Sequence, residues 1–492
     1  MTNGFLDGLK GSLNVTETEN GAVALKSTLN KCVDAFGLLG SMKDSSESQI
    51  IKVFSDAFTE DSKTAMKMLF YIRDIRGGQG ARKVFRICLK WLAQHHPEYV
   101  IQNFDNIALF GRYDDLLVLF DTPIFSHVSL FIRNKLSDDM DEFLALRPCS
   151  LLTKWLPSVN ASSKETRRYA KMLCKSWHMS EKGYRKLLSL LRKHIDVVER
   201  KMSSNNWEDI DFSKVPGKAS LNYASAFIRH DEDRYKEYLY SNSHVNSKAL
   251  YPVDIVKNAV RNRKDSDKQV LYNAMWESLP NYFHENTKGM CVVDTSGSMI
   301  GDPLCVAVSL GMYCADKCTG PFKNHFITFS DTPSLCELSG NTLLEKLSWF
   351  KEINCMSTNI ESVFDLILDT AIKNNLNQED LPDILYIISD MQFNSAINTD
   401  DTVMRTIKRK FVEAGYKVPK IVYWNVRSSN KGMFQETFGD EDVMMVSGYS
   451  PVIFKSVLEC VELNMKYDVS VNPYTLMEST LNNPRYDCVW VG

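Results

Sequence analysis

The chain has 492 residues, a formal net charge of −3, and 44% hydrophobic and 24% charged residues, which is typical of an ordinary soluble globular protein. This length allows two or more domains. No apolar run approaches the roughly 18 residues that a membrane span needs, and residues 1–21 lack the apolar core of a signal peptide. The composition therefore argues against a membrane protein and against secretion.

The twelve cysteines are scattered along the chain and form no paired framework. Several, such as Cys88 and Cys291, lie inside apolar segments. Cys314 and Cys318 are one helical turn apart, but no second pair or histidine cluster completes a zinc site, so we expect buried thiols there. This pattern favours a reducing, intracellular setting, and we expect a cytoplasmic protein.

From about residue 22 to residue 281, apolar residues recur three and four positions apart, which predicts helices. Short polar or Gly/Pro clusters separate these segments, as at Phe110-Gly111-Arg112 and Arg147-Pro148. Helices joined by such short links indicate stacked antiparallel pairs, an irregular helical-repeat region of the HEAT kind. Because the pattern changes near Asn286, we expect one domain over residues 1–285 and another over residues 286–492.

A glycine-rich junction follows the second long helical segment. Gly77-Gly78-Gln79-Gly80 is flanked by Arg73, Arg76 and Arg82. Exposed backbone N–H groups beside arginines can cradle a phosphate. A tight turn between two helices with solvated arginines explains the same residues equally well, so both interpretations stay open.

The most basic stretch runs from Lys164 to Lys201, where twelve Lys or Arg face four Asp or Glu. This local charge of +8 leaves −11 for the rest of the chain and favours an anionic partner. The interleaved aromatic residues either stack on bases or pack the core. They are Trp155, Tyr169, Trp177 and Tyr184. The candidate RNA-binding cations are Arg73, Arg76, Arg82, Lys154, Arg167, Arg168, Lys171, Lys175, Arg185 and Lys186.

Beyond residue 286, short buried strands alternate with helices. The expected strands cover residues 290–293, 326–329, 384–388, 421–424 and 443–446. The expected helices cover residues 304–318, 343–349, 360–374, 403–414 and 451–463. This alternation predicts βαβ units and a mostly parallel, doubly wound sheet, in which ligands bind beyond the carboxyl ends of the strands.

Oxygen-bearing side chains follow the first of these strands. Asp294, Ser296 and Ser298 are spaced two residues apart on a turn. Their oxygen atoms converge on one point, which suits a hard cation such as Mg²⁺. Thr358 precedes a later helix, and Asp390 ends another buried strand.

This combination resembles the metal-ion-dependent adhesion site of von Willebrand factor A domains, over roughly residues 286–465. The resemblance implies hydroxyl ligands from Ser296, Ser298 and Thr358, with Asp294 and Asp390 reaching Mg²⁺ (or Mn²⁺) directly or through water. The residue before the threonine, a glycine in that family, is Ser357 here. The alternative is a degenerate A domain in which the motif is only turn chemistry.

The layout of the whole chain, a helical-repeat region before an A domain, resembles the TROVE-module proteins, which include the Ro autoantigen. Local phrases such as residues 73–82, 155–160 and 215–227 resemble more closely an uncharacterised family of similar layout, met in plants, fungi and bacteriophages. The Ro resemblance implies binding of single-stranded or structured RNA by the helical region.

We therefore expect a non-enzymatic RNA-binding protein whose A domain holds Mg²⁺ and docks a ligand. No serine–histidine–aspartate order, nucleotide-binding Walker loop or catalytic carboxylate pair is evident in the sequence. The alternative is a protein-interaction scaffold that grips the carboxylate of a partner through the metal and binds no RNA.

Overall fold

A computed structural model gives the fold and describes residues 13–195, 197–241, 245–285, 287–329, 332–349, 359–394, 403–428 and 433–492. The chain divides into two compact units, each built from segments distant in sequence. The first unit contains Met1–Ala65 and Leu250–Asn483, and the second contains Met66–Ala249 and Pro484–Gly492. The boundary expected near residue 286 thus lies inside the first unit, because flanking helices pack with the sheet.

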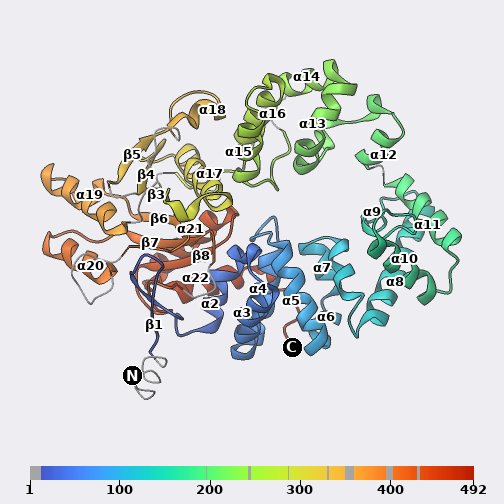
Figure 1. Cartoon of the computed structure of the whole chain (residues 1–492), viewed down its shortest axis with the longest axis horizontal. Helices are drawn as coiled ribbons and strands as arrows, with labels where there is room; N and C mark the ends of the chain where they lie inside the picture. The colour runs from blue at the N-terminus through green and yellow to red at the C-terminus, as the bar shows by residue number, and fades with distance from the viewer. Residues whose placement is uncertain are drawn as a thin grey trace, which may run out of the picture. The chain divides into compact units, whose positions relative to one another are not determined.

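The first unit is built on a six-stranded sheet in the order β5-β4-β3-β6-β7-β8 (Figure 1). The strands are β3 (Gly289–Asp294), β4 (His325–Phe329), β5 (Ser334–Glu337), β6 (Ile384–Ser389), β7 (Lys420–Asn425) and β8 (Val443–Ser447). All neighbours pair in parallel except β4 and β5. All five expected strands are confirmed. The edge strand β5 was not expected, since its exposed, polar sequence lacks an apolar pattern.

Helices cover both faces of this sheet. On one face lie α17 (Asp302–Lys317) and α21 (Val452–Tyr467). The ring of Phe454 on α21 lies 4.9 Å from Tyr386 and 4.8 Å from Trp424. On the other face, α19 (Ile360–Lys373) and α20 (Val403–Glu413) contribute Val363 and Phe411 to one core with strand residues. The expected order of a helical region followed by a mostly parallel sheet is confirmed.

Segments from both sides of the helical region complete the first unit. The strands β1 and β2 form a hairpin, and the Leu25 N–H donates to the Phe434 carbonyl at 2.7 Å. Ser447 on β8 donates through Oγ to the Phe36 carbonyl at 2.9 Å. These elements are β1 (Val15–Glu17), β2 (Val23–Leu25), α2 (Lys31–Leu38), η1 (Leu39–Asp44), α3 (Glu47–Glu60), α15 (Pro252–Arg261), α16 (Ser266–Glu277), η5 (Gly297–Met299), α18 (Leu343–Lys346), η7 (Gln378–Asp380) and α22 (Pro473–Leu481).

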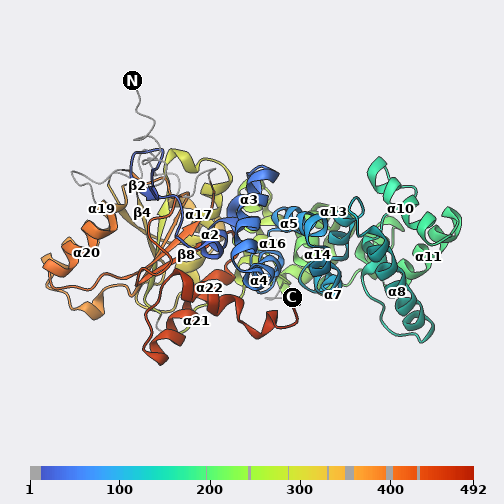
Figure 2. The same cartoon turned by 90° about the horizontal axis from the view of Figure 1, so that it is seen from below.

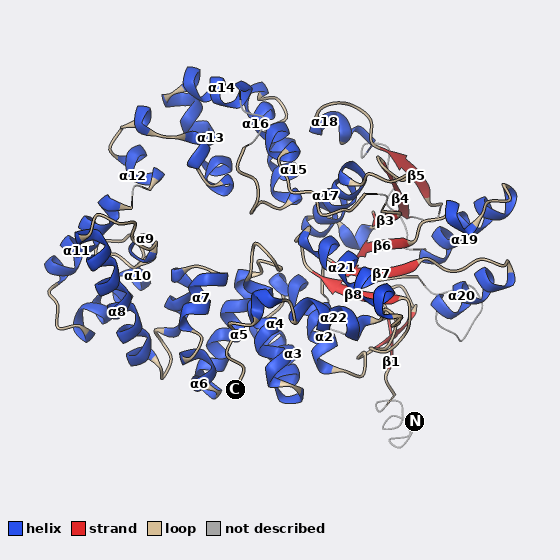
Figure 3. Ribbon diagram, turned by 180° about the vertical axis from the view of Figure 1, so that it is seen from behind, coloured by secondary structure: helices blue, strands red, loops and turns tan. Residues whose placement is uncertain are grey.

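The second unit is helical, and every described strand belongs to the first (Figure 3). The helix α4 (Ser62–Arg73) crosses from one unit to the other. The remaining helices and 3₁₀ segments are α5 (Arg82–His95), α6 (Pro97–Ile101), α7 (Phe104–Phe110), η2 (Tyr113–Leu119), α8 (Phe125–Leu144), α9 (Leu152–Trp155), α10 (Lys164–Ser176), α11 (Glu181–His194), α12 (Val198–Ser203), η3 (Trp207–Asp209), η4 (Phe212–Lys214), α13 (Gly217–His230), α14 (Glu232–Ser241) and η8 (Pro484–Tyr486). None of the described helices is long and apolar enough to cross a membrane.

A buried ion-pair network joins α4, α5 and η2. Asp115 is fully buried and accepts bonds from Arg73 Nε at 2.7 Å and Arg86 Nε at 2.6 Å. The Arg112 N–H donates to the same carboxylate at 3.1 Å. Arg73 is only 4% exposed. This arginine therefore neutralises Asp115 and does not reach a surface that RNA could contact.

The final segment of the chain packs against the helices of the second unit. Arg485 pairs with the buried Asp74, and the Tyr486 ring lies 5.4 Å from that of Phe110. Asn103 holds the backbone of Trp490 through its amide, donating to the carbonyl at 2.9 Å and accepting from the N–H at 3.0 Å. The nine residues Pro484–Gly492, which follow α22, thus belong to the helical unit.

The substitution Asp115→Asn should lower the stability of the chain by about 3–5 kcal/mol, because it leaves the buried Arg73 without a charged partner. Urea unfolding, followed by circular dichroism, measures this loss. The matched control is Glu232→Gln, which removes an exposed ion pair with Lys236 and should cost about 1 kcal/mol or less. Equal losses in the two variants would contradict a structural role for the network.

Candidate metal site and cationic surface

Two carboxylates lie at one edge of the sheet. Asp294 ends β3, and Asp390 follows the last residue of β6. Because β3 and β6 are parallel neighbours, their carboxyl ends meet at the same edge. This is the place where ligands bind in sheets of this kind.

Hydrogen bonds fix these carboxylates and bring the two serines beside them. Asp294 accepts from the Ser296 N–H at 2.9 Å and from Ser389 Oγ at 2.5 Å. The hydroxyl oxygens of Ser296 and Ser298 are 3.1 Å apart. Asp390 accepts from the Gln392 N–H at 3.2 Å. Four of the five expected ligands, Asp294, Ser296, Ser298 and Asp390, are therefore brought together, and Thr358 lies outside the described residues.

Burial perturbs the pKa values of both carboxylates. Burial raises the pKa of Asp294 to about 6, and the nearby Asp390 carboxylate acts in the same direction. Burial also raises the pKa of Asp390, against the opposing effect of a hydrogen bond from Ser298. Among the described residues, no Lys, Arg or His lies within ion-pair distance of either carboxylate. Arg427 donates to the Ser298 carbonyl at 2.8 Å, and its charge opposes part of the rise in the Asp390 pKa. Two buried carboxylates with adjacent hydroxyls fit a hard divalent ion.

No group of three or more His, Cys, Asp or Glu side chains that could hold a metal occurs within the described ranges. The expected ligand set differs from such a group, because it combines two carboxylates with hydroxyl oxygens. That chemistry suits Mg²⁺ or Mn²⁺ and disfavours softer metals that prefer thiolate or imidazole ligands.

The sequence analysis missed several residues around this site. Ser389, which holds Asp294, directly precedes Asp390 and could have been found by its position at the strand end. Nothing in the sequence around Glu19 indicates that this residue lies near the candidate metal site. Its N–H donates to Gln392 Oε1 at 2.8 Å, and Asn20 Nδ2 donates to the Gln392 carbonyl at 2.7 Å. The N-terminal hairpin therefore places a carboxylate near Asp390, where its charge raises the Asp390 pKa.

The helix α10 carries a row of cations in the second unit, next to α8 and α11 (Figure 2). They line a shallow groove of about 500 Å³. The cations are Lys164, Arg167, Arg168, Lys171 and Lys175. Ser163 and Ser180 cap the N-termini of α10 and α11, so the basic residues sit on well-defined helices.

These five cations differ in what they contact. Arg168 forms a two-point ion pair with Asp121, with both N···O distances at 2.6 Å. Arg167 donates to the carbonyls of residues 161 and 162, and Lys171 lies 3.4 Å from Glu181. Lys164 and Lys175 are exposed and have no carboxylate partner among the described residues. The groove therefore keeps unneutralised positive charge at both ends of α10.

The remaining predicted RNA-binding cations are dispersed. Arg76, Arg82 and Lys186 are exposed, and Lys154 and Arg185 line a separate cavity. The glycine-rich junction beside Arg76 is a structural turn. The N–H groups of Gly78 and Gly80 donate to the Asp74 carbonyl at 3.1 Å each. These donors are used within the protein, so the turn interpretation is favoured over a phosphate cradle.

The aromatic residues of the basic region mostly belong to the core. Trp177 is 7% exposed and donates through Nε1 to Ser129 Oγ at 2.9 Å. Tyr184 is buried and donates to the Pro157 carbonyl at 2.8 Å. Trp155 differs from these, because it is half-buried and lines the cavity that contains Lys154.

Comparison with known proteins places the chain in a family. Residues 18–120 and 123–287 match a family model described as a domain of unknown function (DUF2828). The chain belongs to the DUF2828 family. Residues 288–482 of this DUF2828 member match a second model, also described as a domain of unknown function (DUF7788).

Full-length similarity extends to a viral protein. An uncharacterized protein of Acanthamoeba polyphaga mimivirus is 30% identical over 521 aligned residues, covering 96% of this DUF2828 chain and 90% of the viral protein. The crystal structure of the Ro (RSR) protein of Deinococcus radiodurans matches with a TM-score of 0.34 and 11% identity, over 80% of this chain and 93% of the other.

In the metal site, Asp294→Asn should abolish the rise in melting temperature that Mg²⁺ or Mn²⁺ gives the unaltered protein, because binding to the folded state alone stabilises it. Thermal unfolding at several metal concentrations measures this effect. Asp383→Asn, at the exposed opposite end of β6, serves as the matched control and should keep the full metal response. A metal-dependent shift retained in Asp294→Asn would exclude this ligand set.

The same variant should change how stability depends on pH without metal. Because the Asp294 pKa is raised to about 6, the folded state holds more protons than the unfolded state between about pH 4 and pH 6. The contribution of this group to stability therefore falls as pH rises through that window. Relative to the unaltered protein, Asp294→Asn should gain stability between pH 4 and pH 7, as measured in EDTA.

Proposed function

We propose that this protein binds RNA through the α10 face of its helical unit and docks a second ligand at a metal ion held by its sheet unit. The row of cations along α10, open to solvent at Lys164 and Lys175, carries the first part of the proposal. The resemblance of the chain layout to the TROVE-module proteins agrees with it. The protein acts by binding and is assigned no catalytic step.

Phosphate contacts explain why a row of lysines and arginines suits RNA. Each phosphate neutralised on a single strand releases condensed counterions, so affinity depends strongly on salt. Such contacts position the strand without reading its sequence. The cations of α10 that remain free of carboxylates supply this kind of contact, and Arg168 is less available because Asp121 already engages it at two points.

The metal part of the proposal rests on two buried carboxylates, Asp294 and Asp390, that lie at one edge of the sheet beside the hydroxyls of Ser296 and Ser298. Ser296, Ser298 and these two carboxylates would hold Mg²⁺ or Mn²⁺, with Thr358 as a further ligand. A shell of neutral hydroxyls and few charges leaves the ion electrophilic. When bound, the ion supplies an attachment point for an outside carboxylate, such as an aspartate or glutamate of a partner protein.

Replacing Lys164, Lys171 and Lys175 together by Glu should weaken RNA binding for many sequences alike. If each lysine contacts one phosphate, the slope of log K against log salt should become shallower by about 2, at about 0.7 per phosphate. A filter-binding or fluorescence-anisotropy titration with single-stranded RNA at several salt concentrations measures both quantities. Arg167 and Arg168 are left intact because each makes two hydrogen bonds within the chain, whereas Lys171 has one contact of 3.4 Å with Glu181.

The matched control reverses Lys373, Lys455 and Lys466, three exposed lysines of the sheet unit, and changes the net charge equally. It should bind RNA as the unaltered protein does, and so should Asp294→Asn. If the α10 variant also binds normally, or if no affinity is measurable at about 50 mM salt, the RNA proposal fails. Metal-dependent capture of a carboxylate partner would then favour the protein-interaction scaffold.

A further inference from the structure

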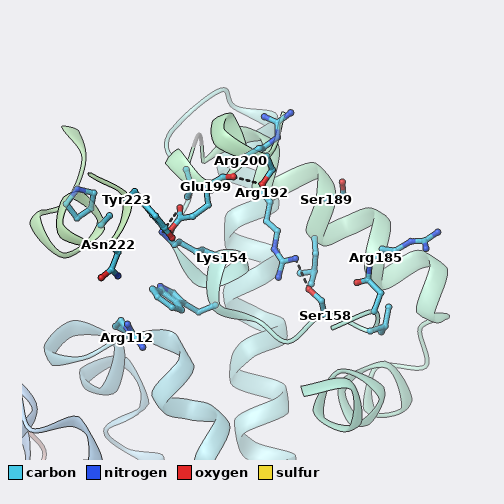
Figure 4. Close-up of a pocket in the computed structure, with 18 of the residues that line it drawn as sticks. Arg112, Lys154, Ser158, Arg185, Ser189, Arg192, Glu199, Arg200, Asn222 and Tyr223 are labelled. Atoms are coloured by element: carbon cyan, nitrogen blue, oxygen red, sulfur yellow. Dashed lines mark hydrogen bonds and ion pairs between the residues drawn. The ribbon is translucent and has the colours of Figure 1, made fainter. Parts of the chain in front are cut away.

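The helical unit contains a cavity of about 960 Å³ (Figure 4). It is lined by α9, the loop that follows α9, α11, α12 and the first turns of α13. Figure 4 shows Arg185 and Ser189 on one side and Asn222 and Tyr223 on the other, with Lys154 and Arg192 between them. The volume is several times that of a phosphate ion and lies in the range of sites for organic ligands.

The wall of this cavity is strongly positive. Among the described lining residues, six are Lys or Arg and one, Glu199, is acidic. They are Arg112, Lys154, Arg185, Arg192, Arg200 and Lys218. Glu199 binds Lys154, with both oxygens at 3.1 Å, and Asp114 binds Arg112. These two carboxylates therefore neutralise Lys154 and Arg112.

Three arginines of the wall face no carboxylate among the described residues. Arg192 donates to the Thr153 carbonyl at 2.7 Å, the Leu156 carbonyl at 2.8 Å and Ser158 Oγ at 2.9 Å, all of them neutral oxygens. A guanidinium group stays charged even when half-buried. Arg200 has one long contact of 3.4 Å with a carbonyl, and Arg185 is exposed at the rim. This excess positive charge would attract an anionic ligand.

The start of α13 adds to the attraction for an anion. This 14-residue helix begins after Pro216, whose side chain offers no cap. Lys218 and Ala219 of the first turn line the cavity. The positive end of the helix dipole therefore lies at the cavity wall, where it favours a negatively charged group such as a phosphate.

A flat ring and amide groups complete the wall. Arg112 packs on the Trp155 ring at 4.0 Å and fixes its orientation, while Trp155 itself lines the cavity. Asn160 and Asn222 are exposed side chains that carry both donors and acceptors. A planar base with polar edges matches this combination better than a peptide or a simple anion does.

We propose that this cavity binds a nucleoside phosphate, with the phosphate at Arg200 and the start of α13 and the base against Trp155 and Asn222. The ligand is either a free nucleotide or one nucleotide of an RNA strand, since both present the same chemistry. The site is separate from the α10 groove and stands whether or not that groove binds RNA.

The experiment uses the full chain and three probes: AMP, inorganic phosphate and a single-stranded RNA of ten nucleotides. Calorimetry or anisotropy gives the affinity of each probe. Arg200→Gln and Trp155→Leu should each weaken binding by about tenfold. Arg229→Gln, an exposed change at the far end of α13, is the matched control and should have no effect. Circular dichroism checks that each variant folds. Because Arg200 is exposed, Arg200→Gln should fold normally, so the test remains valid even if Trp155→Leu fails to fold.

The outcomes distinguish a free nucleotide from a nucleotide of an RNA strand, and the cavity from the α10 groove. If the unaltered protein binds AMP and both variants lose this affinity, the ligand is a free nucleotide. If the unaltered protein binds RNA but not AMP, and both variants lose the affinity for RNA, the ligand is one nucleotide of a strand. If both variants bind AMP and RNA as the control does, or if phosphate binds as tightly as AMP, the proposal is overturned. The triple reversal on α10 should leave AMP binding unchanged, so failure of the RNA groove is distinguishable from failure of the cavity.

Discussion

The helical unit depends on the fully buried carboxylate of Asp115, which holds two arginines and one backbone N–H. A buried charge is tolerated only when its partners are complete, so the helices that supply Arg73 and Arg86 are fixed around it. Arg86 also contacts Asp114, which orients Arg112, and Arg112 lies flat on Trp155. One buried charge thus determines, through a chain of contacts, where the aromatic wall of the cavity stands.

The candidate metal site was predictable because its residues lie at strand ends. A buried apolar strand followed by Asp294, Ser296 and Ser298 specifies both an element and the edge where it ends, and the parallel β6 brings Asp390 to the same edge. Arg73 shows the opposite situation. In the sequence, Arg73 cannot be told from an arginine at the surface. The carboxylate that it binds in the interior, that of Asp115, lies 42 residues further along the chain. Local patterns reveal a site only when its geometry is local.

The two proposed binding regions follow one electrostatic principle with opposite signs. In the sheet unit, Asp294 and Asp390 have no directly paired cation among the described residues, and in the helical unit, Arg192 and Arg200 have no directly paired carboxylate. A folded chain tolerates such an imbalance where a ligand or solvent supplies the missing charge. Membership of the DUF2828 family gives the chain its relatives, while the two proposals of ligand class rest on these charges.

The interleaved course of the chain has a consequence for its synthesis. A ribosome makes residues 13–60 long before their partner strand β8, which spans residues 443–447. The helical unit likewise receives its last nine residues after the sheet is complete. Neither unit can therefore complete its fold before these later segments have been made, and the hydrophobic helices α2 and α3 must wait for their partners while several hundred residues are added.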